Sequence, residues 1–218
     1  MKNNAKTHIL LADDHPMVRD WLAQMINREP GLHVCGEAGN APETLAAIPR
    51  LKPDMVVLDL SMPGAHGTEL IKDIAAQHPK VLLLVLSTHD ETQYAERALC
   101  AGARGYVTKQ ETPDTIRQAI CRVAQGETYT SPKIASILLR KFTSGQTAAT
   151  SPVEALSDRQ LEIFQLIGRG CGPTQIAEDL HLSVKTVENY IARIKEKLLL
   201  KDATELRAYA IEWYKTSG

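Results

Sequence analysis

Between residues 8 and 109 the sequence alternates short apolar runs with longer amphipathic stretches. The apolar runs are bounded by polar residues, glycine or proline, which is typical of parallel strands buried on both faces. They cover residues 8–12, 32–38, 54–60, 81–87 and 103–109. The intervening stretches predict helices over residues 16–29, 42–50, 67–77, 90–101 and 113–125. Strand–helix units repeated in this way favour an α/β doubly wound, five-stranded parallel sheet.

The character of the sequence changes after Gly126. Residues 131–142 predict one more amphipathic helix, and residues 143–152 have the Thr/Ser/Ala/Gly-rich composition of a flexible linker. From Leu156 onward only helical periodicity remains, over residues 158–168, 173–180, 184–198 and 204–215. We therefore expect a first domain over residues 1–126, a helix and linker over 127–155, and a small all-α domain over 156–218.

Composition excludes several classes of protein. The longest apolar run, residues 81–86, has six residues, whereas a membrane helix needs about 20. The first residues show no apolar signal core, and the four scattered cysteines form no Cys-x-x-Cys pair, which is typical of reduced thiols. We expect a cytoplasmic protein with no membrane association. The net charge of −1 means that any affinity for nucleic acid must come from a local patch.

In an open parallel sheet, functional side chains gather at the carboxyl ends of the strands. Asp13 and Asp14 follow the first predicted strand, and Asp59, Ser87 and Lys109 lie at the ends of the third, fourth and fifth. Three carboxylates at one rim repel each other and need a cation, and their hard oxygen ligands suit Mg²⁺. Adjacent acids after a strand can also be simple helix caps, but their coincidence with the other strand ends favours a functional site.

Four segments, ADDHPMVR, VVLDLSMPGAHG, VLSTHDE and AGARGYVTK, together resemble the receiver domain of two-component response regulators. The resemblance covers residues 6–126 and implies a flavodoxin-like strand order of 2-1-3-4-5. It also implies that Asp59 is the phosphoacceptor for a sensor histidine kinase. Asp13, Asp14, Asp59 and the backbone carbonyl of Ser61 would then bind Mg²⁺.

The same resemblance implies how the phosphoryl group is held and sensed. Lys109 would contact the phosphoryl oxygens, and Ser87 and Tyr106 would form the switch pair, although a buried tyrosine is also a common core residue. Ser61 and His89 would stand at the mouth through which attacking water enters. Many receivers carry a proline after the lysine, whereas this chain has glutamine there, so a cis peptide at that point is in doubt.

Residues 156–200 contain two predicted helices joined by a tight turn. Ser183 fits the N-cap of the second helix, and apolar residues at helical spacing provide the inner face of the pair. These apolar residues are Ile176, Ala177, Leu180, Val184, Val187, Ile191 and Ile194. Residues 184–201 carry five basic and two acidic side chains. Such a charge suits a helix in the major groove, but it is also common on solvated helix faces.

The segments LSDRQLEIF and GCGPTQIAEDLHLSVKTVENYIARIKEKL resemble the LuxR-type helix-turn-helix. With the receiver-like part, they make the chain similar to the NarL/FixJ family of transcriptional regulators. The resemblance places Glu188 and Asn189 at the base edges of double-stranded promoter DNA, with the small Ala192 beside them. The residues expected to contact phosphates or to orient the helix are Thr174, Lys185, Thr186, Arg193 and Lys197.

Three positions depart from the LuxR-type pattern. Gln160 and Gln175 stand where the family commonly has glutamate, and we interpret both as changes in helix capping. Leu199 replaces a frequent glycine after the recognition helix. Because glycine usually provides the left-handed cap, this change is expected to affect how the helix ends.

The resemblance implies a DNA-binding transcription regulator, not an enzyme, which dimerises and binds promoters when phosphorylated. RNA polymerase is a further candidate partner. In the last predicted helix, Leu206, Ala210 and Trp213 recur at helical spacing and could form either a dimer seam or part of the domain's own core.

Two other functions stay open. A phosphatase of the haloacid-dehalogenase type would use Asp59 as its nucleophile, but it would need a second acid where Ser61 stands. A receiver that no longer uses phosphate would instead leave a constitutive DNA-binding protein.

Overall fold

The computed structural model describes residues 6–63, 67–143 and 152–217. The chain divides into two compact units, Met1–Thr143 and Ser144–Gly218, and each has its own core. Within the described ranges, no helix combines the length and the apolarity that crossing a bilayer requires.

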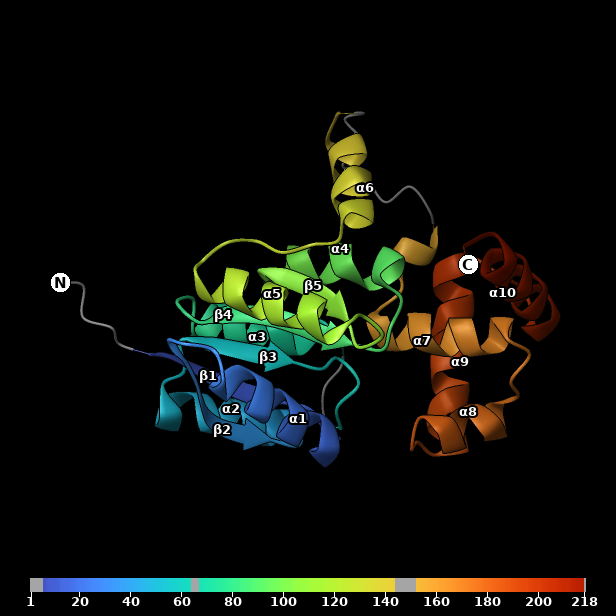
Figure 1. The fold of residues 1–218 in the computed structure, drawn as a ribbon. Coiled ribbons are helices and arrows are strands. Elements are labelled where there is room, and N and C mark those ends of the chain that lie inside the picture. Colours follow the sequence, from blue (N-terminus) through green and yellow to red (C-terminus); the bar gives the residue numbers. More distant parts are fainter. Residues whose placement is uncertain (1–5, 64–66, 144–151, 218) are drawn as a thin grey trace. The chain divides into compact units, whose positions relative to one another are not determined.

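The first unit is built on a parallel sheet with the strand order β2-β1-β3-β4-β5 (Figure 1). The strands are β1 (Thr7–Ala12), β2 (Leu32–Ala38), β3 (Met55–Leu58), β4 (Leu82–Ser87) and β5 (Gly105–Thr108). This topology confirms both the predicted five-stranded fold and the strand order that the resemblance implied. The strands β3 and β5 are shorter than predicted, because the polar rim residues Asp59 and Lys109 lie beyond the regular ladder.

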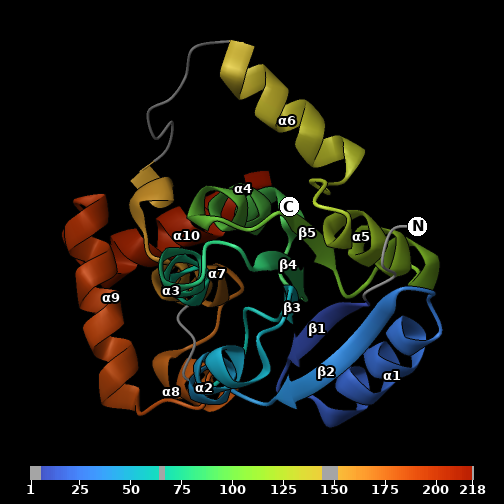
Figure 2. The ribbon, with the colours of Figure 1, turned by 90° about the vertical axis from the view of Figure 1, so that its left-hand side faces the viewer.

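Helices cover both faces of the sheet (Figure 2). On one face lie α1 (Pro16–Asn27) and α5 (Pro113–Ala124), which share a buried cluster with β1, β3 and β4. On the other face lie α2 (Ala41–Leu51), α3 (Glu69–Gln77) and α4 (Glu91–Ala101). Side chains cap three of these helices at their first turns: Asn40 caps α2, Asp90 caps α4 and Thr112 caps α5. These caps satisfy backbone N–H groups that the helices themselves leave unpaired.

Helix α6 (Pro132–Thr143) belongs to the first unit. It packs against α4, buries Ile134, and joins Lys141 to Glu96 of α4 through an ion pair of 2.6 Å. Most of the linker predicted over residues 143–152 lies outside the described residues, and a short 3-10 turn, η1 (Pro152–Ala155), follows it. The predicted boundaries 1–126, 127–155 and 156–218 stay a proposal.

The second unit contains α7 (Asp158–Gly168), α8 (Pro173–Asp179), α9 (Val184–Leu198) and α10 (Ala203–Ser217). Helix α10 packs against α7, burying Leu206 and Ala210 and placing the Trp213 ring 5.5 Å from the ring of Phe164. This contact is close at Gly168, where an added Cβ would lie 2.6 Å from the carbonyl oxygen of Ala210. The apolar stripe of the last helix therefore contributes to the core of its own unit.

Candidate functional site

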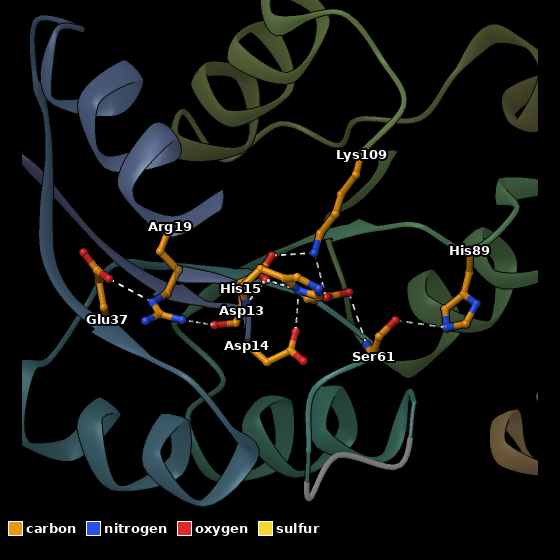
Figure 3. Close-up of polar contacts among 9 residues, drawn as sticks. Asp13, Asp14, His15, Arg19, Glu37, Ser61, His89 and Lys109 are labelled. Carbon is orange, nitrogen blue, oxygen red and sulfur yellow. Dashed lines mark hydrogen bonds and ion pairs between the residues drawn. The ribbon is translucent and has the colours of Figure 1, made fainter. Parts of the chain in front are cut away.

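The carboxyl ends of β1, β3 and β5 bring Asp13, Asp59 and Lys109 into direct contact. Figure 3 shows Lys109 reaching toward Asp13. The Lys109 ammonium lies 2.6 Å from Oδ2 of Asp13 and 2.7 Å from Oδ2 of Asp59. Both carboxylates are almost fully buried, at 3% and 2% exposure. Residues that are 46 or more positions apart in the sequence thus meet at one rim, as the strand ends predicted.

The positive charge of Lys109 and the negative charges of Asp59 and Asp13 partly neutralise one another. Burial raises the pKa of the Asp59 carboxyl above its ordinary value, and the Lys109 ammonium offsets only part of that increase. Burial alone would lower the pKa of Lys109, but the charges of Asp59 and Asp13 outweigh this effect and raise it. The ammonium therefore stays charged at neutral pH and balances part of the negative charge around it.

Asp14 and His15 complete a group of potential metal ligands. Asp13, Asp14, His15 and Asp59 each offer one ligand atom, and these atoms lie within 4.8 Å of one another. Oδ1 of Asp14 is buried and forms no hydrogen bond with any described residue, although Nδ1 of His15 lies 2.8 Å away. Three carboxylates that converge at one rim form a donor set that fits a hard cation such as Mg²⁺.

Sequence reasoning missed two residues of this site. His15 donates its backbone N–H to Oδ1 of Asp13 at 2.9 Å, closing the loop that carries the acids. Arg19, one turn into α1, donates to the backbone carbonyl of Asp13 at 2.6 Å and to Oε2 of Glu37 at 2.9 Å (Figure 3). The sequence offers no signal for Arg19, because any residue type supplies the backbone carbonyl that it contacts.

The remaining predicted residues lie around the loops that follow β3 and β4, close to Asp59. Ser61 donates its backbone N–H to Oδ1 of Asp59 at 3.2 Å, and its hydroxyl lies 3.3 Å from Nε2 of His89. Ser87 is fully buried and accepts from the backbone N–H of His89 at 3.3 Å. The buried Tyr106 points inward and donates to the His89 carbonyl at 2.9 Å, and burial raises its pKa. One short loop around His89 thus links all three side chains.

In the second unit, α8 and α9 form a helix-turn-helix. The turn passes through His181, which has a left-handed backbone (φ 51°), and the Ser183 hydroxyl then caps α9 by accepting from the N–H of Thr186. Arg159 of α7 donates to the carbonyl of Leu180 at 2.9 Å and so holds the end of α8. Ile176, Ala177, Val187 and Ile194 are buried as predicted, whereas Val184 is 39% exposed.

Most of the predicted DNA-contacting residues are exposed. Thr186 is half-buried, because its hydroxyl lies 2.8 Å from that of Ser183 at the cap. The ammonium of Lys197 donates to the carbonyl of Ala155 at 3.1 Å. The exposed members of the set are Thr174, Lys185, Glu188, Asn189, Ala192, Arg193 and Lys197.

Two of the three departures from the family pattern have a structural explanation. Gln160 completes a capping box with Ser157, because its side chain accepts the backbone N–H of Ser157 as a glutamate would. Leu199 ends α9 in the left-handed conformation, with φ 56°, and leaves 88% of its surface exposed. The leucine therefore occupies a position that favours glycine. Gln175 is exposed, and nothing in the structure explains its choice.

Comparison with known protein families agrees with this division. The model for the response regulator receiver domain matches residues 9–121, and the model for bacterial regulatory proteins of the luxR family matches residues 154–210. The first match contains the carboxylate cluster and the predicted switch residues Ser87 and Tyr106, and the second contains the helix-turn-helix. Neither match describes a hydrolytic enzyme of the dehalogenase type.

Relatives match almost the whole chain. The oxygen regulatory protein NreC of Staphylococcus aureus is 38% identical over 209 residues, covering 94% of this chain and 96% of NreC. RcsB from Salmonella enterica serovar Typhimurium, solved on promoter rprA with phosphomimetic BeF3⁻, is 25% identical with a TM-score of 0.61, covering 94% and 98% of the two chains. A structure of two RcsB dimers bound to two parallel DNAs is 26% identical with a TM-score of 0.59, covering 97% and 98%. The chain therefore belongs to the NarL/FixJ family of response regulators, in which a receiver domain precedes a LuxR-type DNA-binding domain.

Proposed function

We propose that Asp59 accepts a phosphoryl group from a phosphohistidine of a sensor kinase and that this controls promoter binding by the second unit. The observation that carries the proposal is the contact of Asp59 with Lys109 beside Asp13, at the carboxyl end of β3. A buried carboxylate that is held by an ammonium and flanked by further acids is suited to phosphoryl transfer.

In the proposed reaction, the N–P bond of the phosphohistidine breaks and an O–P bond to an Asp59 oxygen forms, while the released imidazole takes up a proton. The side chains of Asp13, Asp14 and Asp59 and the carbonyl of Ser61 would hold Mg²⁺. When bound, this ion supplies positive charge for the phosphoryl oxygens. Lys109 already contacts Asp59 and would pair with one of those oxygens.

Ser87 and Tyr106 would change their hydrogen bonds when Asp59 is phosphorylated, and this would alter the conformation of the receiver. The Ser87 hydroxyl would turn to bind a phosphoryl oxygen, which releases the N–H of His89 that it now accepts from. Because Tyr106 donates to the carbonyl of the same residue, movement of that loop changes the partner of its hydroxyl. The two side chains are thereby coupled through one peptide segment.

The output would be DNA binding through α9. Glu188 and Asn189 would face base edges, while Lys185 and Arg193 would contact phosphates. Support comes from their exposure on one face of α9 and from the DNA-bound dimers of the similar protein RcsB. A symmetric dimer on two half-sites is therefore the proposed active form, with RNA polymerase as a further partner. Four unpaired cysteines agree with action in the cytoplasm.

Intact-mass measurement after incubation with acetyl phosphate and Mg²⁺ tests the proposal. We expect one added phosphoryl group in the wild-type protein and none in Asp59→Asn. Asp73→Asn, which changes an exposed carboxylate of α3, is the matched control and should be labelled normally. Full labelling of Asp59→Asn would refute the assignment, and so would an unlabelled wild-type protein.

A further inference from the structure

A row of three side chains that can bind metal ions lies at the amino-terminal edge of the sheet, away from the carboxylate cluster. His33 in β2 pairs in register with His8 in β1, and Asp54 stands directly before Met55 of β3, which pairs with Ile9. The sheet order β2-β1-β3 therefore puts His33, His8 and Asp54 on three adjacent strands. All three are exposed.

The spacing of neighbours in this row is slightly wider than that of ligands on one metal ion. Nδ1 of His8 lies 3.6 Å from Oδ2 of Asp54. Two ligands with tetrahedral bonds of about 2.0–2.1 Å lie roughly 3.4 Å apart. The ring centroids of His8 and His33 are 5.9 Å apart. Two imidazoles on one such ion have centroids about 5–5.5 Å apart, so small rotations of exposed rings complete the set.

The backbone already holds the aspartate end of the row. Oδ2 of Asp54 accepts the N–H of His8 at 2.8 Å, and the Asp54 N–H donates to the His8 carbonyl at 2.9 Å. The Asp54 carbonyl accepts from Leu82 at 2.9 Å, which ties it to β4 as well. Asp54 is therefore held by backbone hydrogen bonds and brings a carboxylate oxygen beside the His8 ring.

We propose that His8, His33 and Asp54 together bind one divalent transition-metal ion of the borderline class, such as Zn²⁺. Imidazole nitrogens select such ions over Mg²⁺, which prefers oxygen ligands. The carboxylate cluster and the histidine row thus differ in donor chemistry and lie at opposite ends of β1. The second site would stabilise β1, β2 and β3 against separation, because an ion that binds only the folded state shifts the unfolding equilibrium.

Calorimetric titration of the full chain with Zn²⁺ in excess Mg²⁺ tests this inference, because Mg²⁺ competes for the carboxylate cluster. We expect one Zn²⁺ to bind and the melting temperature to rise with it. His8→Gln and His33→Gln should each weaken binding by at least about tenfold, since even outer-shell partners of metal ligands contribute 10–100-fold. Both residues are exposed, so circular dichroism should show intact folding.

His181→Asn is the matched control, because it removes an exposed histidine from the second unit. It should leave Zn²⁺ affinity unchanged, since asparagine tolerates the left-handed backbone there. Equal Zn²⁺ affinity in wild type, His8→Gln and His33→Gln would overturn the proposal. Loss of binding only in Asp13→Asn would also overturn it, by assigning the ion to the carboxylate cluster. None of these results depends on whether Asp59 is phosphorylated.

Discussion

The hydroxyl of Ser61 lies 3.3 Å from Nε2 of His89, so the loops after β3 and β4 meet directly above Asp59. The His89 ring also stacks on Tyr94, with ring centroids 4.4 Å apart and planes at 19°. A hydroxyl and an imidazole held in this way can orient a water molecule toward an adjacent acyl phosphate.

We predict that Ser61→Ala and His89→Ala each slow dephosphorylation by about tenfold, below the usual contribution of a positioned acid–base group. Both variants should still be labelled by acetyl phosphate, because Asp59 and Lys109 are unchanged. Loss of the added mass over time, after removal of the phosphoryl donor, measures the rate. His78→Ala, at the end of α3, is the control. Unchanged decay in both test variants would contradict the proposed role.

Arg19 should support metal binding without touching the ion. Its guanidinium connects the Asp13 carbonyl to Glu37, and so fixes the loop that carries the acid pair. We predict that Arg19→Ala weakens Mg²⁺ binding by about tenfold, as is usual for groups that orient ligands, and that Arg19→Lys restores part of the affinity. Calorimetry measures both. The matched control is Arg122→Ala, which removes an exposed ion pair of 2.8 Å with Glu127. Equal Mg²⁺ affinity in Arg19→Ala and the control would refute this role.

Leu199→Gly should stabilise the second unit. The leucine holds φ 56° with most of its surface exposed, so glycine relieves backbone strain and loses little packing. We predict a gain of about 0.5–1 kcal/mol in the free energy of unfolding. This figure already subtracts the entropic cost of ordering a glycine, which is more flexible in the unfolded chain. Leu139→Gly, an exposed leucine inside α6, should be destabilising instead. Urea unfolding compares the two, and a loss of stability in Leu199→Gly would refute the account.

Lys185 and Asn189 lie one turn apart on the same face of α9, and their substitutions should give different DNA phenotypes. Lys185→Ala should weaken binding to specific and random DNA alike and reduce the salt dependence by about one phosphate contact, whereas Asn189→Ala should relax base preference. Lys215→Ala on α10 is the control for charge alone. Binding to both DNAs at several salt concentrations distinguishes these outcomes. If Asn189→Ala weakened specific and random DNA equally, the proposed register of α9 would be wrong.

Glu43 should contribute to stability only above acidic pH. Its pKa is lowered from 4.5, first by the N–H of Gly39 and then by the side chain of Asn40. A carboxyl with a depressed pKa stabilises the fold above its ordinary pKa, and this contribution disappears as the pH falls through the folded-state value. Glu43→Gln should therefore be less stable than wild type at neutral pH, and the difference should shrink in acid. A difference that stays constant with pH in urea unfolding would contradict this.

Strand ends were the part of the site that sequence could predict. Asp59 and Lys109 follow apolar runs, and parallel strands bring such ends to one edge whatever the details of packing. Arg19 and His15 could not be assigned in the same way, because their partners are a backbone carbonyl and a side chain whose positions depend on the folded loop. The 3.3 Å contact between Ser61 and His89 likewise depends on where two loops converge.

In the second unit, periodicity predicted the helices but not the burial of every apolar residue in them. Val184 lies in phase with the apolar face, yet it is the first residue of α9 and has no preceding turn to cover it. Leu206 and Ala210 also fit either a dimer seam or a core by spacing alone. Only their contact with α7 shows that both are used in the core of their own unit.

Helix α6 determines where this protein can be cut and rejoined. Because Ile134 is buried and Lys141 is paired with Glu96, a chain ended at Gly126 would expose part of α4. A chimera that exchanges the output domain should therefore keep everything through Thr143 and be fused within the segment that follows. Chimeric regulators fused after Thr143 would keep the first unit intact, whichever promoter the new output domain recognises.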